Sequence, residues 1–329
     1  MEYATFSDGG KVSKLSLGSW HIFPRLSFDD SVALIKRALD LGISFFDVGD
    51  YWDHDISNEE RFGAVMRHLG VRRDAYQVAI KVFTNSAERR DVLLKESLSR
   101  LGITYTDFVI CARPPAAETM SEAAESMADL VSSGLAKRLG FHNWTPDLLD
   151  QVIAGLKACN GPMPQMLQLQ YSVSRRGVVE SQEFADMFAR TGIKLQAANT
   201  LEGGILAGHV VRERFHESDR AKGTWFTDRN ICRDSGGIRP QIREKAQLLA
   251  EAARKIGATP TQLAMAFCLL NPNLATVLFG ATRPEQLDEN VGALRLAAER
   301  PDEVLAATAS LFVDGTKAPP PFDHVAGVH

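Results

Sequence analysis

Residues 280–290 combine side chains and backbone positions that suit a bound phosphate. Gly280 follows a short apolar run over 276–279, which is typical of a buried strand, and a helical pattern begins after Arg283. A glycine between a strand and a helix leaves backbone N–H groups at the helix N-terminus, where anions bind well. Arg283 adds a side chain that can hold a phosphate with two hydrogen bonds. The turn is therefore predicted to hold the phosphorylated adenosine end of a dinucleotide.

Polar side chains continue along the predicted helix. Gln286, Glu289 and Asn290 are three and four residues apart, so they share one helix face and can reach one ligand. Thr282 lies in the turn before them. The same pattern also describes a capped surface helix whose polar face meets water. The segment by itself leaves both interpretations open.

Asp47 and Lys81 each end a largely apolar run, at 44–46 and 78–80. A lone charge at the end of a buried strand is costly unless it is paired, and a facing Asp–Lys pair removes that cost. Such a pair also lowers the pKa of a neighbouring phenol or hydroxyl acid. The alternative is a salt bridge that only closes the end of the sheet.

Titratable side chains crowd the segment that follows Asp47. Tyr51 and His54 lie among the aspartates of residues 50–55. Ionisable groups gather in this way at catalytic sites, so this segment is a candidate part of the site. A solvated acidic turn is the simpler interpretation of Asp53 and Asp55.

These residues need a scaffold that brings several strand ends together. Strand-like segments alternate with helical patterns, and regular alternation over about 250 residues indicates an α/β fold of the (β/α)8 TIM-barrel type. A doubly wound sheet is the rival fold, but residues 15–20 lack the GxGxxG fingerprint that follows its first strand. The strands of the predicted barrel span 15–18, 44–47, 76–82, 108–111, 137–141, 166–169, 194–198 and 276–279.

A single domain over 1–329 is the simplest organisation. The turn Asp8-Gly9-Gly10 predicts an N-terminal hairpin within 1–14. The segment 199–240 follows the seventh strand and is too long for a passive connection, so it is predicted to be a lid over cofactor or substrate. Residues 315–329 contain three consecutive prolines and are expected to form a C-terminal tail near the barrel mouth.

In a barrel of this kind the active site lies at the C-terminal ends of the strands. In this chain, those positions are Trp20, Asp47, Lys81, Ala112, Arg113, His142, Asn143, Gln168, Asn199 and Gly280.

Net charge, apolar runs and cysteine spacing limit the kinds of molecule that this protein is expected to bind. The net charge of −4 gives no general attraction to nucleic acid, and the longest apolar runs are too short to span a membrane. The first residues show no signal-peptide pattern, and the four cysteines show neither a CxxC pair nor metal-ligand spacing. We therefore expect a cytoplasmic protein that acts on a small-molecule substrate, without a metal; the oligomeric state stays open.

Several ordered segments together resemble the aldo-keto reductase superfamily, and within it the branch that contains the β subunits of voltage-gated potassium channels. The resemblance covers roughly residues 12–294. It is carried by Val12 to Trp20, Gly42 to Asp47, Asn58-Glu59 with Gly63, Lys81, Tyr105 to Pro114, Gln168 to Tyr171, and Gly280 to Asn290.

The resemblance implies a barrel that binds NADP(H) in an extended form and transfers hydride from C4 of the nicotinamide to a carbonyl carbon. In the family a Tyr is the general acid, Lys and Asp assist it, and a His on the fourth strand orients the carbonyl. Asp47 and Lys81 fall on the family's catalytic Asp and Lys. The cofactor site expected from the resemblance and the strand ends comprises Ser19, Trp20, Asp47, His142, Asn143, Gln168, Asn199, Leu201, Gly280, Thr282, Arg283, Gln286, Glu289 and Asn290.

The chain departs from the family at the reacting centre. Ala112 occupies the position of the carbonyl-orienting His, and Trp52 occupies that of the Tyr. Tyr51 is adjacent and becomes the first candidate for the acid if the loop shifts by one residue, with His54 as the second. Trp52, Ala112 and Arg113 are expected to line the substrate pocket.

Three functions fit this pattern. The first is an NADP(H)-dependent oxidoreductase that acts on a carbonyl or alcohol of a small molecule, with a modified active site. The second is different chemistry on the same barrel, such as enoyl reduction or a redox-neutral elimination or epimerisation, because the missing His helps to place the substrate carbonyl. The third is a non-catalytic protein that senses NADP(H), since the channel β subunits also lack that His. The retained Asp47 and Lys81 argue against the third function, and the first is preferred.

Overall fold

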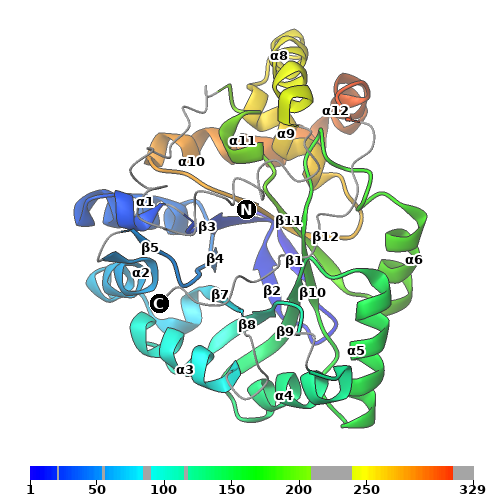
Figure 1. The fold of residues 1–329 in the computed structure, drawn as a ribbon. Coiled ribbons are helices and arrows are strands. Elements are labelled where there is room, and N and C mark those ends of the chain that lie inside the picture. The colour runs from blue at the N-terminus through cyan, green and yellow to red at the C-terminus, as the bar shows by residue number, and fades with distance from the viewer. Residues whose placement is uncertain (21, 54–55, 84–89, 115–117, 209–238, 314–329) are drawn as a thin grey trace, which may run out of the picture.

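The computed structural model describes residues 1–20, 22–53, 56–83, 90–114, 118–208 and 239–313. Within these residues, parallel strands close into a barrel surrounded by helices (Figure 1), and the last strand pairs with the first. The predicted (β/α)8 barrel is therefore confirmed. In order around the barrel the strands are β3 (Leu15–Gly18), β4 (Phe45–Asp47), β7 (Gln77–Val82), β8 (Thr106–Cys111), β9 (Ala136–His142), β10 (Met166–Gln170), β11 (Lys194–Ala198) and β12 (Leu274–Phe279).

Several helices begin at residue types that the sequence marks as caps. The Ser27 hydroxyl accepts a hydrogen bond from the backbone N–H of Asp30 at 3.0 Å, and Thr119 and Thr259 form capping boxes. The α-helices are α1 (Phe28–Asp40), α2 (Asn58–His68), α3 (Arg90–Leu101), α4 (Met120–Ser132), α5 (Pro146–Ala158), α6 (Gln182–Thr191), α8 (Arg239–Lys255), α9 (Pro260–Leu269), α10 (Pro284–Asn290), α11 (Gly292–Glu299) and α12 (Pro301–Thr308).

The structure adds elements that the sequence pattern does not predict. β5 (Trp52–Asp53) and β6 (Ile56–Ser57) pair in the loop after β4, and strands this short carry no periodicity. The helix expected after Arg283 divides at Val291 into α10 and α11, and α12 follows it.

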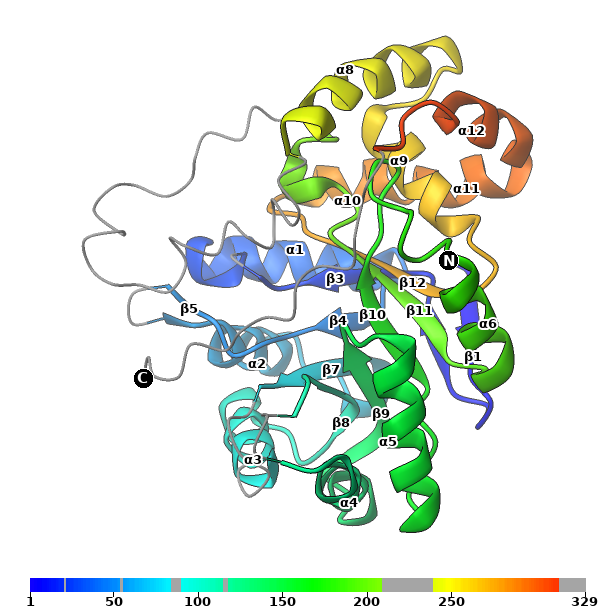
Figure 2. The same ribbon diagram turned by 45° about the vertical axis from the view of Figure 1, so that its right-hand side comes forward.

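The predicted N-terminal hairpin is present and covers one end of the barrel. It consists of β1 (Tyr3–Thr5) and β2 (Lys11–Ser13), and its Phe6 packs against Phe108 inside the barrel with ring centroids 5.2 Å apart. Figure 2 shows the hairpin and β5 at opposite ends of the barrel. The hairpin therefore covers the N-terminal end of the barrel with apolar packing.

Alternation along the strands divides the barrel interior into two layers, because every second side chain points inward. Asp47, Lys81 and Gln168 each follow an inward apolar residue by two positions, so they form a polar layer above an apolar one. The inward apolar residues that pack with the hairpin are Phe45, Ala79, Phe108, Ile110, Met166 and Ala275, and of these Ile110 is level with Lys81.

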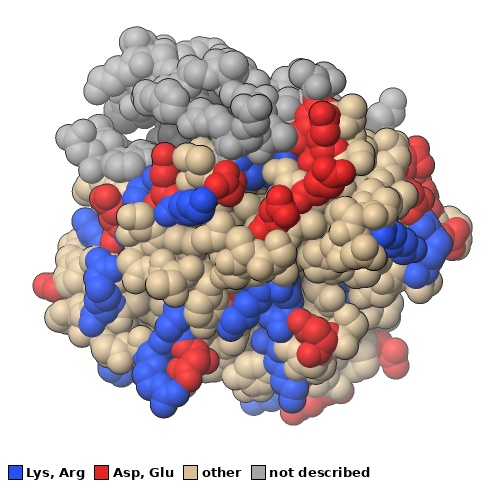
Figure 3. Space-filling model, turned by 90° about the horizontal axis from the view of Figure 1, so that it is seen from below, with Lys and Arg blue, Asp and Glu red and all other residues tan. Residues whose placement is uncertain are grey.

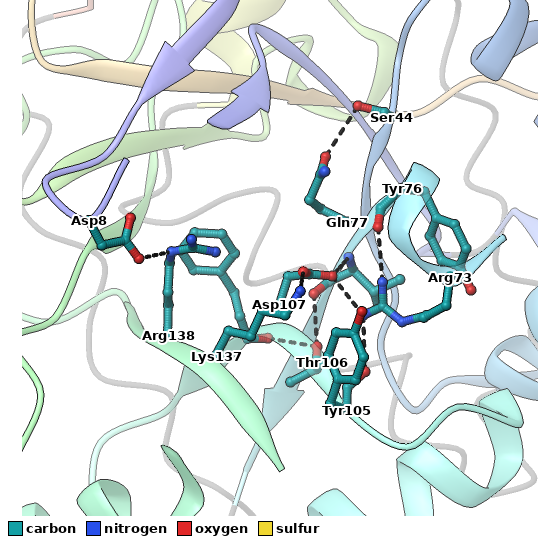
Figure 4. A network of polar contacts seen from close by, with 12 residues as sticks. Asp8, Ser44, Arg73, Tyr76, Gln77, Tyr105, Thr106, Asp107, Lys137 and Arg138 are labelled. Atoms are coloured by element: carbon teal, nitrogen blue, oxygen red, sulfur yellow. Dashed lines mark hydrogen bonds and ion pairs between the residues drawn. The ribbon is translucent and has the colours of Figure 1, made fainter. Parts of the chain in front are cut away.

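A separate polar network surrounds Asp107 at the N-terminal ends of the strands (Figure 4). The Asp107 carboxylate accepts hydrogen bonds from Arg73 Nη2 at 2.6 Å, Lys137 Nζ at 3.1 Å and the Val78 backbone N–H at 3.0 Å. The two cations also lie over the Tyr105 ring, at 4.2 and 4.3 Å from its centroid. Asp107 is only 3% exposed, so these donors compensate a buried charge.

The outer surface carries both signs of charge. Figure 3 shows Lys and Arg beside Asp and Glu across one face of the molecule. A groove between α3 and α4 is lined by mainly acidic and hydroxyl side chains, and it lies on the outer wall rather than at the strand ends. No helix in the described part of the chain combines the length and apolar character needed to cross a membrane.

Candidate active site

Asp47 and Lys81 form the predicted pair at the C-terminal end of the barrel. Lys81 Nζ lies 2.5 Å from Asp47 Oδ1, and the two side chains are 8% and 4% exposed. Their strands are neighbours, with Asp47 in register with Ala79, so inward positions two residues after Phe45 and Ala79 bring the two side chains together. The side chains around the pair decide whether it is only a structural salt bridge.

Gln168 extends the pair across the barrel. Its Nε2 donates to Asp47 Oδ2 at 2.7 Å and to Gln196 Oε1 at 2.9 Å. Gln196, on β11, is fully buried and is absent from the sequence-based prediction. The available signal was a single polar residue between the apolar Leu195 and Ala197.

His142 and Asn143 join the same chain of contacts. His142 Nδ1 lies 2.8 Å from Gln168 Oε1, and Asn143 Nδ2 lies 3.1 Å from His142 Nε2. Asn143 has a φ of 56°, a left-handed conformation that Asn tolerates, and its backbone N–H donates to the Gln168 carbonyl at 2.9 Å. The Phe83 ring lies edge-on to His142 with centroids 5.9 Å apart. The structure thus brings together Asp47, Lys81, Gln168, His142 and Asn143.

The loop after β4 holds Tyr51 against the barrel end. A Cβ placed on Gly49 would lie 2.5 Å from the Tyr51 ring, so only glycine allows this close packing. The Tyr51 carbonyl accepts from the Asn58 backbone N–H at 2.8 Å, and its ring lies 6.5 Å from that of Trp20. Tyr51 is therefore fixed at the start of this loop by backbone and ring contacts.

Ser19 and Asn58 support the same loop. The Ser19 hydroxyl accepts from Asn58 Nδ2 at 2.7 Å and from the Gly49 N–H at 3.3 Å, and Asn58 Nδ2 also donates to the Gly49 carbonyl at 3.0 Å. Ser19, predicted as a cofactor residue, thus also fastens the loop to the end of β3. Asn58 is one of the residues on which the family resemblance rests, and in this structure it supports the loop.

The acidic residues of the loop do not all face the site. Asp50 contacts Arg100 Nη2 at 3.2 Å, and Arg100 Nε also donates to Glu59 at 2.6 Å. Burial raises the pKa of Glu59 to about 7, despite the opposing effect of Arg100. Asp50 is therefore turned toward α3. His54, Asp55 and the side chain of Trp52 lie outside the described residues.

Ala112 and Arg113 follow β8 at the barrel mouth. The Ala112 methyl is buried and offers no hydrogen bond, while its N–H donates to the Val82 carbonyl at 3.1 Å. Burial lowers the pKa of Arg113, whose Nε is buried without a hydrogen-bond partner among the described residues. Burial raises the pKa of the adjacent Cys111 to about 12, so this thiol is inert.

The turn at 280–290 differs from the prediction in one respect. The backbone N–H groups of Thr282 and Arg283 both donate to Gln286 Oε1, at 2.8 and 3.1 Å, so they are not available as the sequence suggested. Gln286 reaches them because it stands three residues after Arg283, as in a capping box. Arg283 is exposed and Asn290 is buried.

Two further parts of the predicted cofactor site have their own supports. Gly280 is exposed at the end of β12, and the Glu289 carbonyl accepts from Gln262 Nε2 at 3.0 Å. Asn199 Nδ2 donates at 3.1 Å to Glu202, which is 2% exposed. Half-buried Leu201 accepts two backbone hydrogen bonds in the same turn. The rest of the predicted lid, 209–238, lies outside the described residues.

A buried ion pair fixes the start of that segment. Glu202 Oε1 accepts from Ser172 Oγ at 2.7 Å and from Arg175 Nε at 3.2 Å, and burial raises the pKa of Glu202. Glu202 also has a φ of 48°, which is uncommon for this residue type. The sequence offered no signal for this pair.

Comparison with known proteins gives a consistent result. The profile described as "Aldo/keto reductase family" matches residues 14–310. The chain is 29% identical to a probable voltage-gated potassium channel subunit beta from Oryza sativa subsp. japonica, over 89% of this chain and 91% of that protein. It is 28% identical to the Arabidopsis thaliana protein of the same description, with the same coverage, and 29% identical to a putative one from Schizosaccharomyces pombe, over 90% and 89%. The chain therefore belongs to the aldo/keto reductase family.

Proposed function

We propose that this protein is an NADP(H)-dependent oxidoreductase that acts on a carbonyl or alcohol of a small molecule. The observation that carries the proposal is the buried Asp47–Lys81 pair at the barrel mouth, linked through Gln168 to His142 and Asn143. A lysine ammonium held by a carboxylate can stabilise the negative oxygen that develops when a carbonyl is reduced or a phenol gives up its proton.

The residues at the mouth fit a nicotinamide cofactor. Asn143 Oδ1 and Gln196 Nε2 are buried without a hydrogen-bond partner among the described residues. Orphaned buried atoms of this kind are rare unless a ligand or water satisfies them. A carboxamide has both a donor and an acceptor, so it could pair with Asn143 Oδ1 and Gln196 Nε2, between which Gln168 is held by its own hydrogen bonds. When bound, NADPH supplies the hydride.

The protein's own residues would supply the proton that the substrate oxygen takes up. Tyr51 is the first candidate for the acid that protonates the substrate oxygen, and Lys81 would stabilise the phenolate left behind. His54 is the second candidate. Ala112 cannot orient the carbonyl by a hydrogen bond, so that task falls to Lys81 and the acid.

A cofactor-sensing protein without rapid turnover is the second candidate. Two observations favour it: the similar proteins are described as channel subunits, and Ala112 offers no donor. Enoyl reduction or a redox-neutral reaction is the third candidate, because Ala112 offers no donor that could place a substrate carbonyl. For either catalytic function the substrate is expected to be a small molecule of the cytoplasm.

Carbonyl reduction is tested with NADPH and a panel of aldehydes, ketones and quinones, followed by the loss of NADPH absorbance. Saturable turnover with at least one carbonyl supports the proposal. NADPH binding with no turnover beyond a single hydride transfer would instead support the sensing protein. Conversion of substrate without any change in NADPH would support redox-neutral chemistry.

Cofactor choice gives a second test, because Arg283 is predicted to contact the 2′-phosphate. Loss of a charge-assisted hydrogen bond costs about 1.5–3 kcal/mol, or roughly ten- to a hundredfold in affinity. Arg283→Ala should therefore weaken NADP⁺ binding by this factor and leave NAD⁺ binding nearly unchanged in fluorescence titrations. Arg254→Ala, an exposed arginine on α8, is the control. Equal affinities of the unchanged protein for the two cofactors would contradict the prediction.

A further inference from the structure

The contacts of Gln168 fix the direction of a chain of hydrogen bonds. A carboxylate can only accept, so the Gln168 atom that lies 2.7 Å from Asp47 Oδ2 must be Nε2. The same nitrogen uses its second hydrogen on Gln196 Oε1. Gln168 Oε1 therefore faces His142 and can only accept from it.

This direction selects one tautomer of His142. Nδ1 lies 2.8 Å from Gln168 Oε1 and must carry a hydrogen. In a neutral ring, Nε2 then holds a lone pair, which accepts from Asn143 Nδ2 at 3.1 Å. Asn143 in turn presents its Oδ1, which is buried and has no hydrogen-bond partner among the described residues. The chain from Asp47 thus ends in an acceptor at the barrel mouth.

Protonation of His142 would reverse the direction of the hydrogen bond between His142 and Asn143. Nδ1 would still donate to Gln168, but Nε2–H would face the Asn143 amide nitrogen, and two donors cannot bond. The Asn143 amide satisfies Nε2–H by turning over, which moves Nδ2 into the place of Oδ1. The mouth would then present a donor where it presented an acceptor.

We propose that His142 is a positioning residue whose protonation state decides which ligand group Asn143 recognises. With neutral His142 the site takes a primary carboxamide, which donates to Asn143 Oδ1. With protonated His142 it takes a carboxylate, which accepts from the turned amide and benefits from the nearby imidazolium. The inference rests on the proposed function, because the ligand is a pyridine nucleotide that carries one group or the other.

Other charges at this end of the barrel are largely compensated. Asp47 is held by Lys81, and the buried Glu202 is held by Arg175. Arg113 follows β8 and is the remaining half-buried cation near the mouth, while Arg283 is exposed. Asp50 in the loop after β4 and Glu59 at the start of α2 both contact Arg100 on α3. In the hydrogen-bond chain from Asp47 to Asn143, His142 is the group expected to change charge between about pH 5 and 8.

The experiment compares NADP⁺ with its nicotinic-acid analogue, which has a carboxylate in place of the carboxamide. Dissociation constants are measured by fluorescence quenching from about pH 5 to 8. The ratio of the two constants cancels the contribution of the shared phosphates and adenosine. At the alkaline end NADP⁺ should bind roughly ten- to a hundredfold more tightly than the analogue, and this preference should shrink at least about tenfold toward the acidic end.

Two variants separate positioning from simple loss of a side chain. His142→Asn keeps an amide N–H that can donate to Gln168 but does not titrate, so its ratio should stay flat with pH. His68→Asn changes an exposed histidine at the end of α2 and should behave like the unchanged protein. A ratio that does not change with pH in the unchanged protein overturns the proposal.

Nitrogen NMR of the cofactor-free protein gives a readout that does not depend on binding or on the variant's folding. In ¹⁵N-histidine-labelled protein, neutral His142 should be the Nδ1–H tautomer, and the Nε2–H tautomer would overturn the inference. Failure of NADP⁺ to bind at any pH would contradict the proposed function, so the two failures are distinguishable.

Discussion

The two ends of the barrel each bury an aspartate beside a lysine, but the two arrangements differ. Asp107 and Asp47 are both 3% exposed. Asp107 accepts from Arg73, Lys137 and the Val78 N–H, and the two cations are further held by Tyr105. Asp47 accepts from Lys81 and Gln168, and Gln168 leads on to His142.

The difference lies in where each network stops. The contacts of Asp107 end on groups at the N-terminal end of the barrel, so its charge is compensated within the fold, although Arg73 Nε is buried without a partner among the described residues (Figure 4). The network of Asp47 ends at Asn143 Oδ1 and Gln196 Nε2, which are buried without partners in the described part of the chain. A buried charge whose donors all belong to the fold contributes to stability, whereas unpaired buried atoms at the C-terminal end of a barrel are typical of a ligand site.

The lysines of the two ends give the largest expected contrast. Lys81→Met should lower turnover by roughly 10²–10⁴-fold, because it removes the cation beside Asp47, and should leave NADP⁺ affinity largely intact. Lys137→Met should leave turnover unchanged, since its half-exposed side chain lies at the opposite end. Steady-state kinetics with an accepted substrate compare them. If Lys81→Met keeps most of its kcat, Lys81 is a structural partner like Lys137.

The residue that donates the proton should also lie at the C-terminal end of the barrel. Tyr51→Phe should lower kcat by about 10²-fold or more if Tyr51 is the acid, and His54→Gln should do so if the acid is His54. A phenol would give an alkaline limb in the pH profile, and an imidazole a limb near pH 6.5, its usual pKa. Tyr3→Phe, on the hairpin at the closed end, is the control. Full activity in both loop variants would mean that water or a substrate group supplies the proton, and would favour redox-neutral chemistry.

At the closed end the expected effect is on stability. Asp107→Asn leaves Arg73 and Lys137 without their shared carboxylate, which should cost about 2–3 kcal/mol, at the low end because Lys137 is half-exposed. Urea unfolding measures this loss, while turnover per folded molecule should be unchanged. Asp74→Asn, which breaks an exposed pair with Arg72, should leave stability nearly unchanged. Similar losses of stability in the two variants would show that the buried Asp107 network stabilises the fold no more than an exposed ion pair does.

Glu59 should change the pH dependence of stability. Burial raises the pKa of Glu59 to about 7 from an ordinary value of 4.5. Between these values the folded protein binds more protons than the unfolded chain, so the free energy of unfolding falls as pH rises through this window. The slope is at most about 1.4 kcal/mol per pH unit. Glu59→Gln should remove this slope in unfolding measurements at several pH values; an unchanged slope would show that Glu59 is ionised throughout.

Much of this comparison could be read from position along the strands. Asp47 follows its apolar run, whereas Asp107 precedes the apolar run 108–111, so the two were bound to lie at opposite ends of a parallel barrel. The caps at Ser27 and the hairpin turn at 8–10 were equally visible. The β5–β6 pair and Gln196 were not predicted, because a two-residue strand and a single polar residue carry no period.

The sequence by itself determined the barrel and the clustering of Asp47, Lys81, Gln168, His142 and Asn143, because strand periodicity and order decide which residues reach the C-terminal ends. Only the tertiary structure decided which atoms pair there. Gln168 finds Asp47 across 121 residues of chain, and Gln286 takes the N–H groups that the turn seemed to leave open. Hydrogen-bond direction depends on the set of partners around each polar atom, and that set exists only after distant strands have closed into one barrel.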